Sequence, residues 1–215
     1  MHLKRQQIPK TWPLPRKGTT YVVRPSFSIE KGIPLLVVLR DILKIVHDRK
    51  EAKKAIHAKN ILLNNLAVMN EKSNVLLFDT IKIIPSEKFY RMELSEKRKF
   101  EIREISKNEA NKKISKIINK KILNGKKTQL NLNDGRNFIS SVKCKVNDSV
   151  LIDFDKKKIE KILPLKEKAK VIIFEGKHSG KTGIINSINS EKKMTELSVN
   201  EEKINVLIRQ IIVVE

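Results

Sequence analysis

Short runs of β-branched and aliphatic residues, separated by turn-forming residues, make up the C-terminal part of the chain. Five such runs occur there, at residues 171–174, 184–188, 195–199, 204–208 and 211–214. None is long enough for an ordinary helix, and β-branched side chains favour strands. Because regularly spaced short strands are typical of small barrels, the pattern predicts a small β-barrel in this part of the chain.

The turn between the first two runs, within FEGKHSGKTGII (174–185), looks at first like a nucleotide-binding loop. A P-loop requires Gly, four residues, Gly, Lys and Ser or Thr, followed by a helix. Here three residues separate Gly176 from Gly180, and Glu175 places a carboxylate where phosphates would lie. A β-branched run follows in place of a helix. The stretch therefore predicts a strand, a glycine turn and a strand, and no ATP site.

Helical spacing begins after Pro34, a residue that suits a first helical position. Apolar residues recur at helical spacing over residues 35–46. Asp48, with Glu51 three residues later, predicts a variant capping box at the start of a second helix. The expected buried stripe of that second helix consists of Ala52, Ala55 and Ile56.

Residues 60–68 predict a tight hairpin around Asn64-Asn65, because Asn tolerates positive φ. Residues 75–78 and 81–84 predict further strands. Residues 85–165 predict a mainly β region with one short helix, which starts at a capping box of Ser106 and Glu109 and ends before Ile117. The hairpin signals in this region are Asn124-Gly125, Asp134-Gly135 and the paired runs 148–152 and 159–163.

The charge of the chain points to a polyanionic partner. It has 46 Lys and Arg residues against 24 Asp and Glu residues, a formal net charge of +22. An excess of this size is typical of proteins that bind nucleic acid or anionic membranes. A membrane is the weaker choice, since the longest apolar stretch, Leu35–Leu39, is far too short to span a bilayer. We therefore expect a nucleic-acid-binding protein.

A cytosolic location is expected from two features. The first ten residues lack the apolar core of a signal peptide. The single cysteine, Cys144, excludes an internal disulfide and fits a reducing compartment.

The first 32 residues read as an extended basic arm. They contain several prolines, and no acidic residue precedes Glu30. We expect this arm to become ordered against its partner. Trp12 has two interpretations, packing on the first folded unit or stacking on a base, and packing is favoured.

Candidate catalytic and metal-binding groups are few. The four histidines, His2, His47, His57 and His178, show no metal-ligand spacing. Cys144 alternates with Val142 and Val146, so a buried strand residue is favoured over a nucleophile. Asp153 and Asp155 are interpreted as an exposed strand end and turn rather than a metal loop. We expect no cofactor, no metal and no enzymatic activity.

Residues 35–84 resemble the small RNA-binding module of the S4 superfamily, with two short helices, a hairpin and a further strand. The matching positions are Arg49, Ala52, Ile56, Leu63-Asn64-Asn65, Val75 and Asp79-Thr80-Ile81. Asn65 stands where the module usually has Gly. The resemblance implies that the second helix and the hairpin present cations to structured RNA.

Residues 171–185 resemble a KOW motif, the strand–loop–strand of SH3-like barrels in ribosomal and transcription proteins. The resemblance implies that the loop tip, with Lys177, His178 and Lys181, meets a phosphate backbone. Glu175 departs from the motif, in which relatives often carry another glycine.

The order of these modules is similar to that of the archaeal and eukaryotic S4e family of small-subunit ribosomal proteins. The strings that carry the similarity are MHLKRQQIPKTWPLPRKG, IPLLVVLRDILKI, EANKKISKI and GKKTQLNLNDGRN. Residues 24–28 fit less well. The resemblance implies a structural constituent of the small subunit whose partners are its rRNA and neighbouring ribosomal proteins, without membrane contact or homo-oligomerisation.

Two other functions remain open at this point. One is an RNA-modifying enzyme anchored by an S4-like module, which would need a catalytic domain with an active aspartate; residues 85–165 look too small and too basic for one. The other is a transcription or ribosome-assembly factor that uses the KOW motif transiently.

The expected fold is α+β and multi-domain. It has a basic arm (1–32), an S4-like module (33–85), a mainly β central domain (86–166) and a KOW domain with an SH3-like barrel (167–215). The predicted rRNA-binding residues are His2, Lys4, Arg5, Lys10, Arg16, Lys17, Arg24, Arg40, Lys44, Arg49, Lys50, Lys53, Lys54, Lys59, Lys177, His178 and Lys181.

Overall fold

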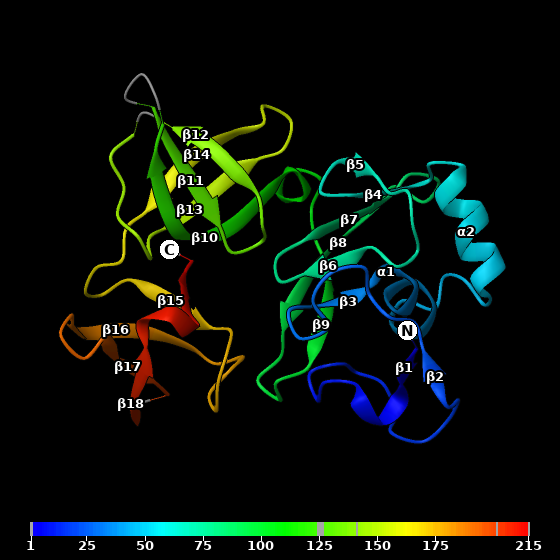
Figure 1. Cartoon of the computed structure of the whole chain (residues 1–215), viewed down its shortest axis with the longest axis horizontal. Coiled ribbons are helices and arrows are strands. Elements are labelled where there is room, and N and C mark those ends of the chain that lie inside the picture. Colours follow the sequence, from blue (N-terminus) through cyan, green and yellow to red (C-terminus); the bar gives the residue numbers. More distant parts are fainter. Residues whose placement is uncertain (1, 124–126, 141, 201, 215) are drawn as a thin grey trace. The chain divides into compact units, whose positions relative to one another are not determined.

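The computed structural model describes residues 2–123, 127–140, 142–200 and 202–214. It divides into two compact units, Met1–Asn111 and Lys112–Glu215 (Figure 1). Antiparallel strands dominate both units, and the helical segments are few and short. The α+β prediction is thus confirmed in a coarse form, as a mostly β chain with few helices.

The first unit contains, among its described residues, two small two-stranded sheets and one five-stranded sheet of order β5-β4-β7-β8-β9. β1 pairs with β2 and β3 pairs with β6. Since β7 pairs with β8, the large sheet crosses the predicted boundary between residues 85 and 86. The strands are β1 (Leu3–Lys4), β2 (Tyr21–Val22), β3 (Gly32–Pro34), β4 (Ile61–Leu63), β5 (Leu66–Ala67), β6 (Asn74–Leu76), β7 (Thr80–Ile83), β8 (Lys88–Leu94) and β9 (Phe100–Glu104).

The hairpin of β4 and β5 has the predicted Asn64-Asn65 turn, with φ of 51° and 64°. Asn64 is buried, and its amide makes two bonds. Its Nδ2 donates to Asp79 Oδ1 at 2.7 Å, and its Oδ1 accepts the backbone N–H of Thr80 at 3.0 Å. Asn thus supplies both the left-handed backbone and the polar partners that a buried turn requires.

The first helical segment is shorter than predicted. Helix α1 (Leu35–Val37) continues as a π-type turn over Val38–Ile42, and the chain leaves the helix before Val46. Lys44 has a φ of 54°, a left-handed conformation that ends a helix. Pro34 has extended backbone and lies before the first helical residue, not at it.

Helix α2 (Arg49–His57) begins after Asp48, as predicted, but the capping contact differs. The Asp48 side chain makes no capping bond. Glu51 accepts the backbone N–H of His47 at 2.8 Å, one residue earlier than in a capping box. Ala52 and Ile56 are buried and Ala55 is half-buried, so the predicted stripe is confirmed.

The N-terminal segment packs on the first unit. Leu3 and Trp12 belong to its core, together with Ile33, Leu35 and Met92. The backbone N–H of Phe100 donates to the Thr11 carbonyl at 2.8 Å. Packing of Trp12, which is 2% exposed, is therefore confirmed. The segment is held by the chain itself, whereas the sequence suggested an arm ordered by its partner, because Leu3 and Trp12 bury apolar surface here.

The second unit contains, in its described part, two five-stranded antiparallel sheets. Their orders are β12-β11-β10-β13-β14 and β18-β17-β16-β15-β19. The strands are β10 (Lys112–Ile122), β11 (Thr128–Leu132), β12 (Asn137–Ser140), β13 (Ser149–Asp153), β14 (Lys158–Leu163), β15 (Lys170–Ile173), β16 (Thr182–Asn189), β17 (Met194–Val199), β18 (Glu202–Leu207) and β19 (Ile211–Val213). All five strands predicted at the C-terminus are present.

The helix predicted to end before Ile117 is wrong. Only a 3-10 turn forms there, η3 (Glu109–Asn111), and strand β10 starts at Lys112. The isoleucines of this segment, which match a helical stripe by count, lie in a strand that pairs with β13 and β11. Neighbouring strands supply backbone partners that single-segment periodicity does not register.

The other expectations for this region have mixed outcomes. The hairpin at Asp134-Gly135 is confirmed, with Gly135 at φ 84°, as is the β13–β14 hairpin. Asn124-Gly125 lies outside the described residues. Cys144 is buried as expected but lies in the connection between β12 and β13, not in a strand. Asp153 is buried rather than exposed, because its Oδ1 accepts the backbone N–H of Asp155 at 2.9 Å.

The two sheets of the second unit share apolar and polar contacts. Ile114 of β10 and Leu163 of β14 pack into the core of the C-terminal sheet, around Val171 and Leu197. The hydroxyl of Ser149 accepts the backbone N–H of Val213 at 2.9 Å. The predicted domain boundary at residues 166 and 167 falls in the connection between these two sheets.

Candidate nucleic-acid interface

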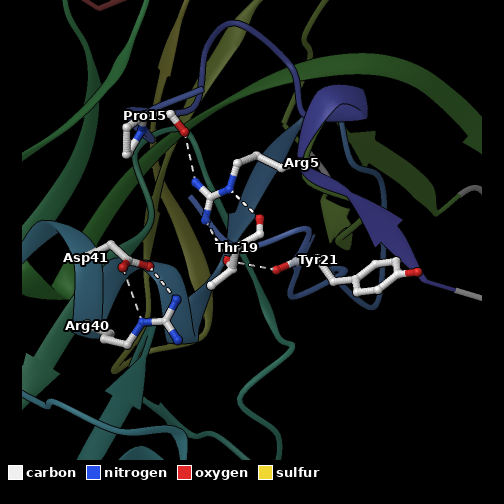
Figure 2. A network of polar contacts seen from close by, with 6 residues as sticks. All are labelled: Arg5, Pro15, Thr19, Tyr21, Arg40 and Asp41. Atoms are coloured by element: carbon white, nitrogen blue, oxygen red, sulfur yellow. Dashed lines mark hydrogen bonds and ion pairs between the residues drawn. The ribbon is translucent and has the colours of Figure 1, made fainter. Parts of the chain in front are cut away.

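Arg5 serves the fold of the N-terminal segment (Figure 2). Its Nε donates to the Thr19 carbonyl at 2.7 Å, its Nη1 to the Pro15 carbonyl at 2.8 Å and its Nη2 to Thr19 Oγ1 at 2.8 Å. Gly18, at φ 136°, lies so close that an added Cβ would be 3.2 Å from the guanidinium carbon. Arg5, which was predicted to contact RNA, therefore closes the loop formed by residues 5–19.

The other predicted rRNA-binding residues of this segment lie on its outside. The ring of His2 lies 5.3 Å from that of Tyr21, centroid to centroid. No acidic residue precedes Glu30 in the sequence, so the charged side chains that this segment contributes before Glu30 are all basic. The exposed members are His2, Lys4, Lys10, Arg16, Lys17 and Arg24.

The cations of helix α2 (Arg49–His57) point in two directions, toward the buried face and away from it. Successive residues are about 100° apart around a helix, so Arg49 and Lys53 lie near the buried face of Ala52 and Ile56. Lys50 and Lys54, one turn apart, point away from it. Both lysines are exposed, and neither side chain has a hydrogen bond or ion pair with any residue that the structure describes.

Glu71 forms ion pairs with Arg49 and Lys53, the two cations near the buried face of α2. Its Oε1 lies 2.6 Å from Arg49 Nη2 and 3.8 Å from Lys53 Nζ, and its side chain is 7% exposed. Burial on its own raises the pKa of the Glu71 carboxyl. The hydrogen bond from Arg49 and the charges of Lys53 and Arg49 outweigh burial, and the pKa lies below its ordinary value.

The remaining cations predicted in this unit are of two kinds. Arg40 is paired with its neighbour Asp41, with 2.9 Å between Nη2 and Oδ2 (Figure 2). Lys44 and Lys59 are exposed and lie at left-handed positions, φ 54° and 57°, directly after helical segments. Their side chains therefore project at the ends of those segments.

The loop between β15 and β16 is a tight turn built on two glycines. Gly176 and Gly180 have φ of 92° and 91°, conformations that L residues rarely adopt. Lys177 is exposed, whereas His178 and Lys181 are half-buried. Strand β16 follows directly and no helix begins here, consistent with the rejection of a P-loop.

Glu175, which departs from the KOW pattern, acts on a buried lysine. Lys116 of β10 donates from Nζ to the carbonyls of Ile208 and Ile211, the latter at 2.9 Å. Burial lowers the pKa of Lys116 to about 8, and the charge of Glu175 opposes that decrease. The unusual carboxylate in the loop thus offsets part of the cost of a buried cation.

Sequence reasoning missed three lysines that serve the fold. Lys116 is one. Lys82 donates to the side-chain oxygens of Asn65, at 2.6 Å, and Asn111. Lys113 forms a buried ion pair with Asp134, 2.9 Å between Nζ and Oδ2. The signal that could have identified them is a lysine at a strand position on the buried side. Recognising such a position requires the strand register.

No metal centre, reactive thiol or membrane span emerges from the described residues. Among them, no cluster of three or more His, Cys, Asp or Glu side chains is placed to hold a metal. Burial raises the pKa of the Cys144 thiol, although the charge of Lys120 opposes this. No helix in the described part is long and apolar enough to cross a membrane.

The comparisons with known proteins agree on one family. Residues 86–159 match the family described as Ribosomal family S4e, and residues 1–27 match the RS4NT (NUC023) domain. The small ribosomal subunit protein eS4 of Methanocella arvoryzae is 38% identical over 190 residues, which cover 87% of this chain and 80% of that protein. The eS4 protein of Nanoarchaeum equitans is 35% identical over 191 residues, or 87% and 82%.

A solved structure shows a similar fold. The crystal structure of the 30S ribosomal protein S4e from Thermoplasma acidophilum superimposes with a TM-score of 0.74 at 24% identity. The match covers 86% of this chain and 95% of that one.

Proposed function

Because the chain belongs to the S4e family of small-subunit ribosomal proteins, we propose that it binds small-subunit rRNA through three cationic surfaces. The family makes it a structural constituent of the small ribosomal subunit and not an enzyme. The two alternatives, an RNA-modifying enzyme and a transcription or assembly factor, have no support from the relatives. Its place is then the cytoplasmic ribosome, with rRNA and ribosomal proteins as partners.

The three surfaces belong to three of the four proposed domains. The N-terminal segment (1–32) offers its exposed cations. An S4-like module (33–85) offers the outer face of α2, followed in the chain by the Asn64-Asn65 hairpin. A KOW domain of the SH3-like type (167–215) offers the glycine turn between β15 and β16. The central domain (86–166) lies between the last two in the sequence.

The proposed mechanism is distributed neutralisation of phosphates. Each lysine acts as a point charge on the RNA backbone, and counterions leave as it binds. Arg5, Arg40 and Arg49 already have partners within the chain. Specificity should come mainly from RNA shape, since A-form grooves hide base edges.

The single observation that carries the proposal is that only some of the cations on α2 are paired with an acidic residue. Glu71 compensates Arg49 and Lys53, whereas Lys50 and Lys54 face solvent without an acidic partner in the described part of the chain. Two such lysines one helical turn apart repel each other in the free protein. A phosphate backbone across this face relieves that repulsion.

The test is charge reversal at the two outer lysines, Lys50→Glu with Lys54→Glu. We expect affinity for small-subunit rRNA to fall by at least about tenfold and the salt dependence to become shallower by about two phosphate contacts. The matched control reverses Lys97 and Lys99, two exposed lysines of the β8–β9 turn in the same unit. Circular dichroism would verify that both variants keep the fold.

Affinity and salt slope equal to those of the control would remove this face of α2 from the interface. Membership of the particle is tested separately, by sucrose-gradient fractionation of a cell lysate at low and high salt. The protein should remain with small subunits in both conditions, whereas a transient factor would dissociate at high salt.

A further inference from the structure

One face of the sheet formed by β10, β11 and β12 is lined with amide side chains. The register aligns Asn119, Asn131 and Asn137 as one row across the three strands. The adjacent row consists of Lys121, Gln129 and Ile139. We call these six residues the amide face. Leu130 and Leu132, which alternate with them along β11, are buried in the core on the other side.

A bulge in β10 produces this alignment. The pairing of β10 with β11 shifts register between Ile117 and Asn119. Ile117 is fully buried, whereas Asn119 and Lys121 are exposed. The extra residue thus changes which side chains of β10 face each side of the sheet after the bulge. The polar residues at the end of β10 therefore lie beside those of β11.

The amide face is accessible and only partly hydrogen-bonded. Asn119 and Asn137 are exposed, Asn131 and Gln129 are half-buried, and Ile139 is 65% exposed. Gln129 Nε2 donates to Asn131 Oδ1 at 2.9 Å, and Asn119 Oδ1 accepts the backbone N–H of Lys120 at 2.8 Å. Within the described part of the chain, the amide nitrogens of Asn119, Asn131 and Asn137 have no acceptor.

The segment that carries the amide face contributes exposed charge of one sign. The sequence from Lys112 to Asp148 has only two acidic residues, Asp134 and Asp148. The Asp134 carboxylate is buried against Lys113, and Asp148 is buried with the backbone N–H groups of Lys145 and Leu165. The exposed charges of this segment are therefore those of its lysines, and Arg136 is half-buried.

We propose that the amide face binds an unpaired stretch of small-subunit rRNA. Amide groups both donate and accept, which matches the base edges that single-stranded RNA presents. Lys121 at the edge of the face meets a phosphate, and Ile139 packs on a base. This inference rests on the proposed function and adds base contacts to its phosphate contacts. An apolar protein partner fits less well, because Ile139 is the one aliphatic residue among the six.

The test uses two full-length variants. Asn131→Ala with Asn137→Ala removes amides without changing charge, and Ile139→Glu adds a carboxylate to the face. The control for the second is Ile84→Glu, which makes the same change at an isoleucine that is 52% exposed in the β7–β8 turn of the other unit. The measurements are affinity for small-subunit rRNA over a range of salt, and chemical probing of base edges in the complex.

We expect each face variant to weaken binding by about tenfold, with Ile84→Glu within about twofold of the parent. The amide variant should keep the parent salt slope, because it loses base contacts and no phosphate contacts. It should also lose protection at a few unpaired bases. Two results would overturn the inference: parent-like affinity and base protection in both variants, or normal rRNA binding combined with loss from assembled particles, which would assign the face to a protein neighbour. A parent protein that does not bind the rRNA would refute the proposed function itself.

Discussion

At the scale of single residues, the role of a cation depends on whether the chain itself compensates it. Arg5 and Lys50 are both basic residues of a basic protein. Arg5 donates three hydrogen bonds to Pro15 and Thr19, whereas Lys50 points into solvent. The first closes a loop and the second is available for phosphate. Composition counts both in the same way, so exposure and partners have to be read from the structure.

The buried pair of Lys113 and Asp134 gives a prediction about stability. Their side chains are 2% and 5% exposed. Burial on its own raises the pKa of Asp134. The charge and the hydrogen bond of Lys113 lower it by more, so the pKa of Asp134 lies below its ordinary value. Lys113→Met leaves a carboxylate without its main partner and should cost about 3–5 kcal/mol of unfolding free energy.

The control for this prediction is the double variant Lys113→Met with Asp134→Asn. The asparagine oxygen can still accept the backbone N–H of Arg136, which Asp134 binds at 3.1 Å, and no charge is left unpaired. Denaturant unfolding should show the double variant to be clearly more stable than Lys113→Met alone. Equal stabilities would mean that an Asp134 carboxylate without Lys113 costs little, and would contradict the prediction.

Glu71 gives a prediction about pH. Its pKa in the folded chain lies below the ordinary value of 4.5, so the folded state binds the proton less tightly than the unfolded state. The stabilisation is therefore complete above that value and is lost as pH falls through the folded pKa. We expect the parent to lose more stability than Glu71→Gln between pH 6 and pH 3. Parallel stability curves for the two proteins would contradict this.

At the scale of elements, the strands and turns followed from the sequence more closely than the helices did. The Asn64-Asn65 and Asp134-Gly135 turns are set by local backbone preference, and both form as predicted. Strand β10 was predicted in part as a helix, since its isoleucines fit both periods. Its pairing with β13, on residues 149–153, decided the matter. Long-range partners of this kind are invisible to a window of neighbouring residues.

Lys116 of β10, which donates to the carbonyl of Ile211 in β19, predicts a pH dependence of the same sign as that of Glu71, at higher pH. Its pKa of about 8 in the folded chain lies below the ordinary 10.5. Between these values the unfolded state binds more protons, so stability rises with pH. Relative to Lys116→Met, the parent should gain up to about 3 kcal/mol between pH 8 and pH 10.5. Thermal or denaturant unfolding of both proteins at several pH values measures the difference, which cancels the effect of the other lysines.

At the scale of the whole molecule, a net charge of +22 opposes the compact state until anions surround it. If the proposed surfaces make roughly 6–10 phosphate contacts, affinity for small-subunit rRNA should fall about 10³–10⁵-fold between 50 and 200 mM salt. Filter binding or fluorescence anisotropy over that range gives the slope. A shallow slope would show that most of the exposed lysines remain in solvent in the complex.

The sequence by itself determined the cationic character of this protein, its β-rich C-terminal part and its positive-φ turns, because charge and local backbone preference reside in single residues or adjacent pairs. It also carried the family resemblance that the comparisons confirmed. Only the tertiary structure decided that residues 112–122 are a strand, that Trp12 packs in a core, and that Arg5, Arg49 and Lys116 have partners within the chain. Those outcomes depend on residues far apart in sequence, which supply the hydrogen bonds and the buried surface.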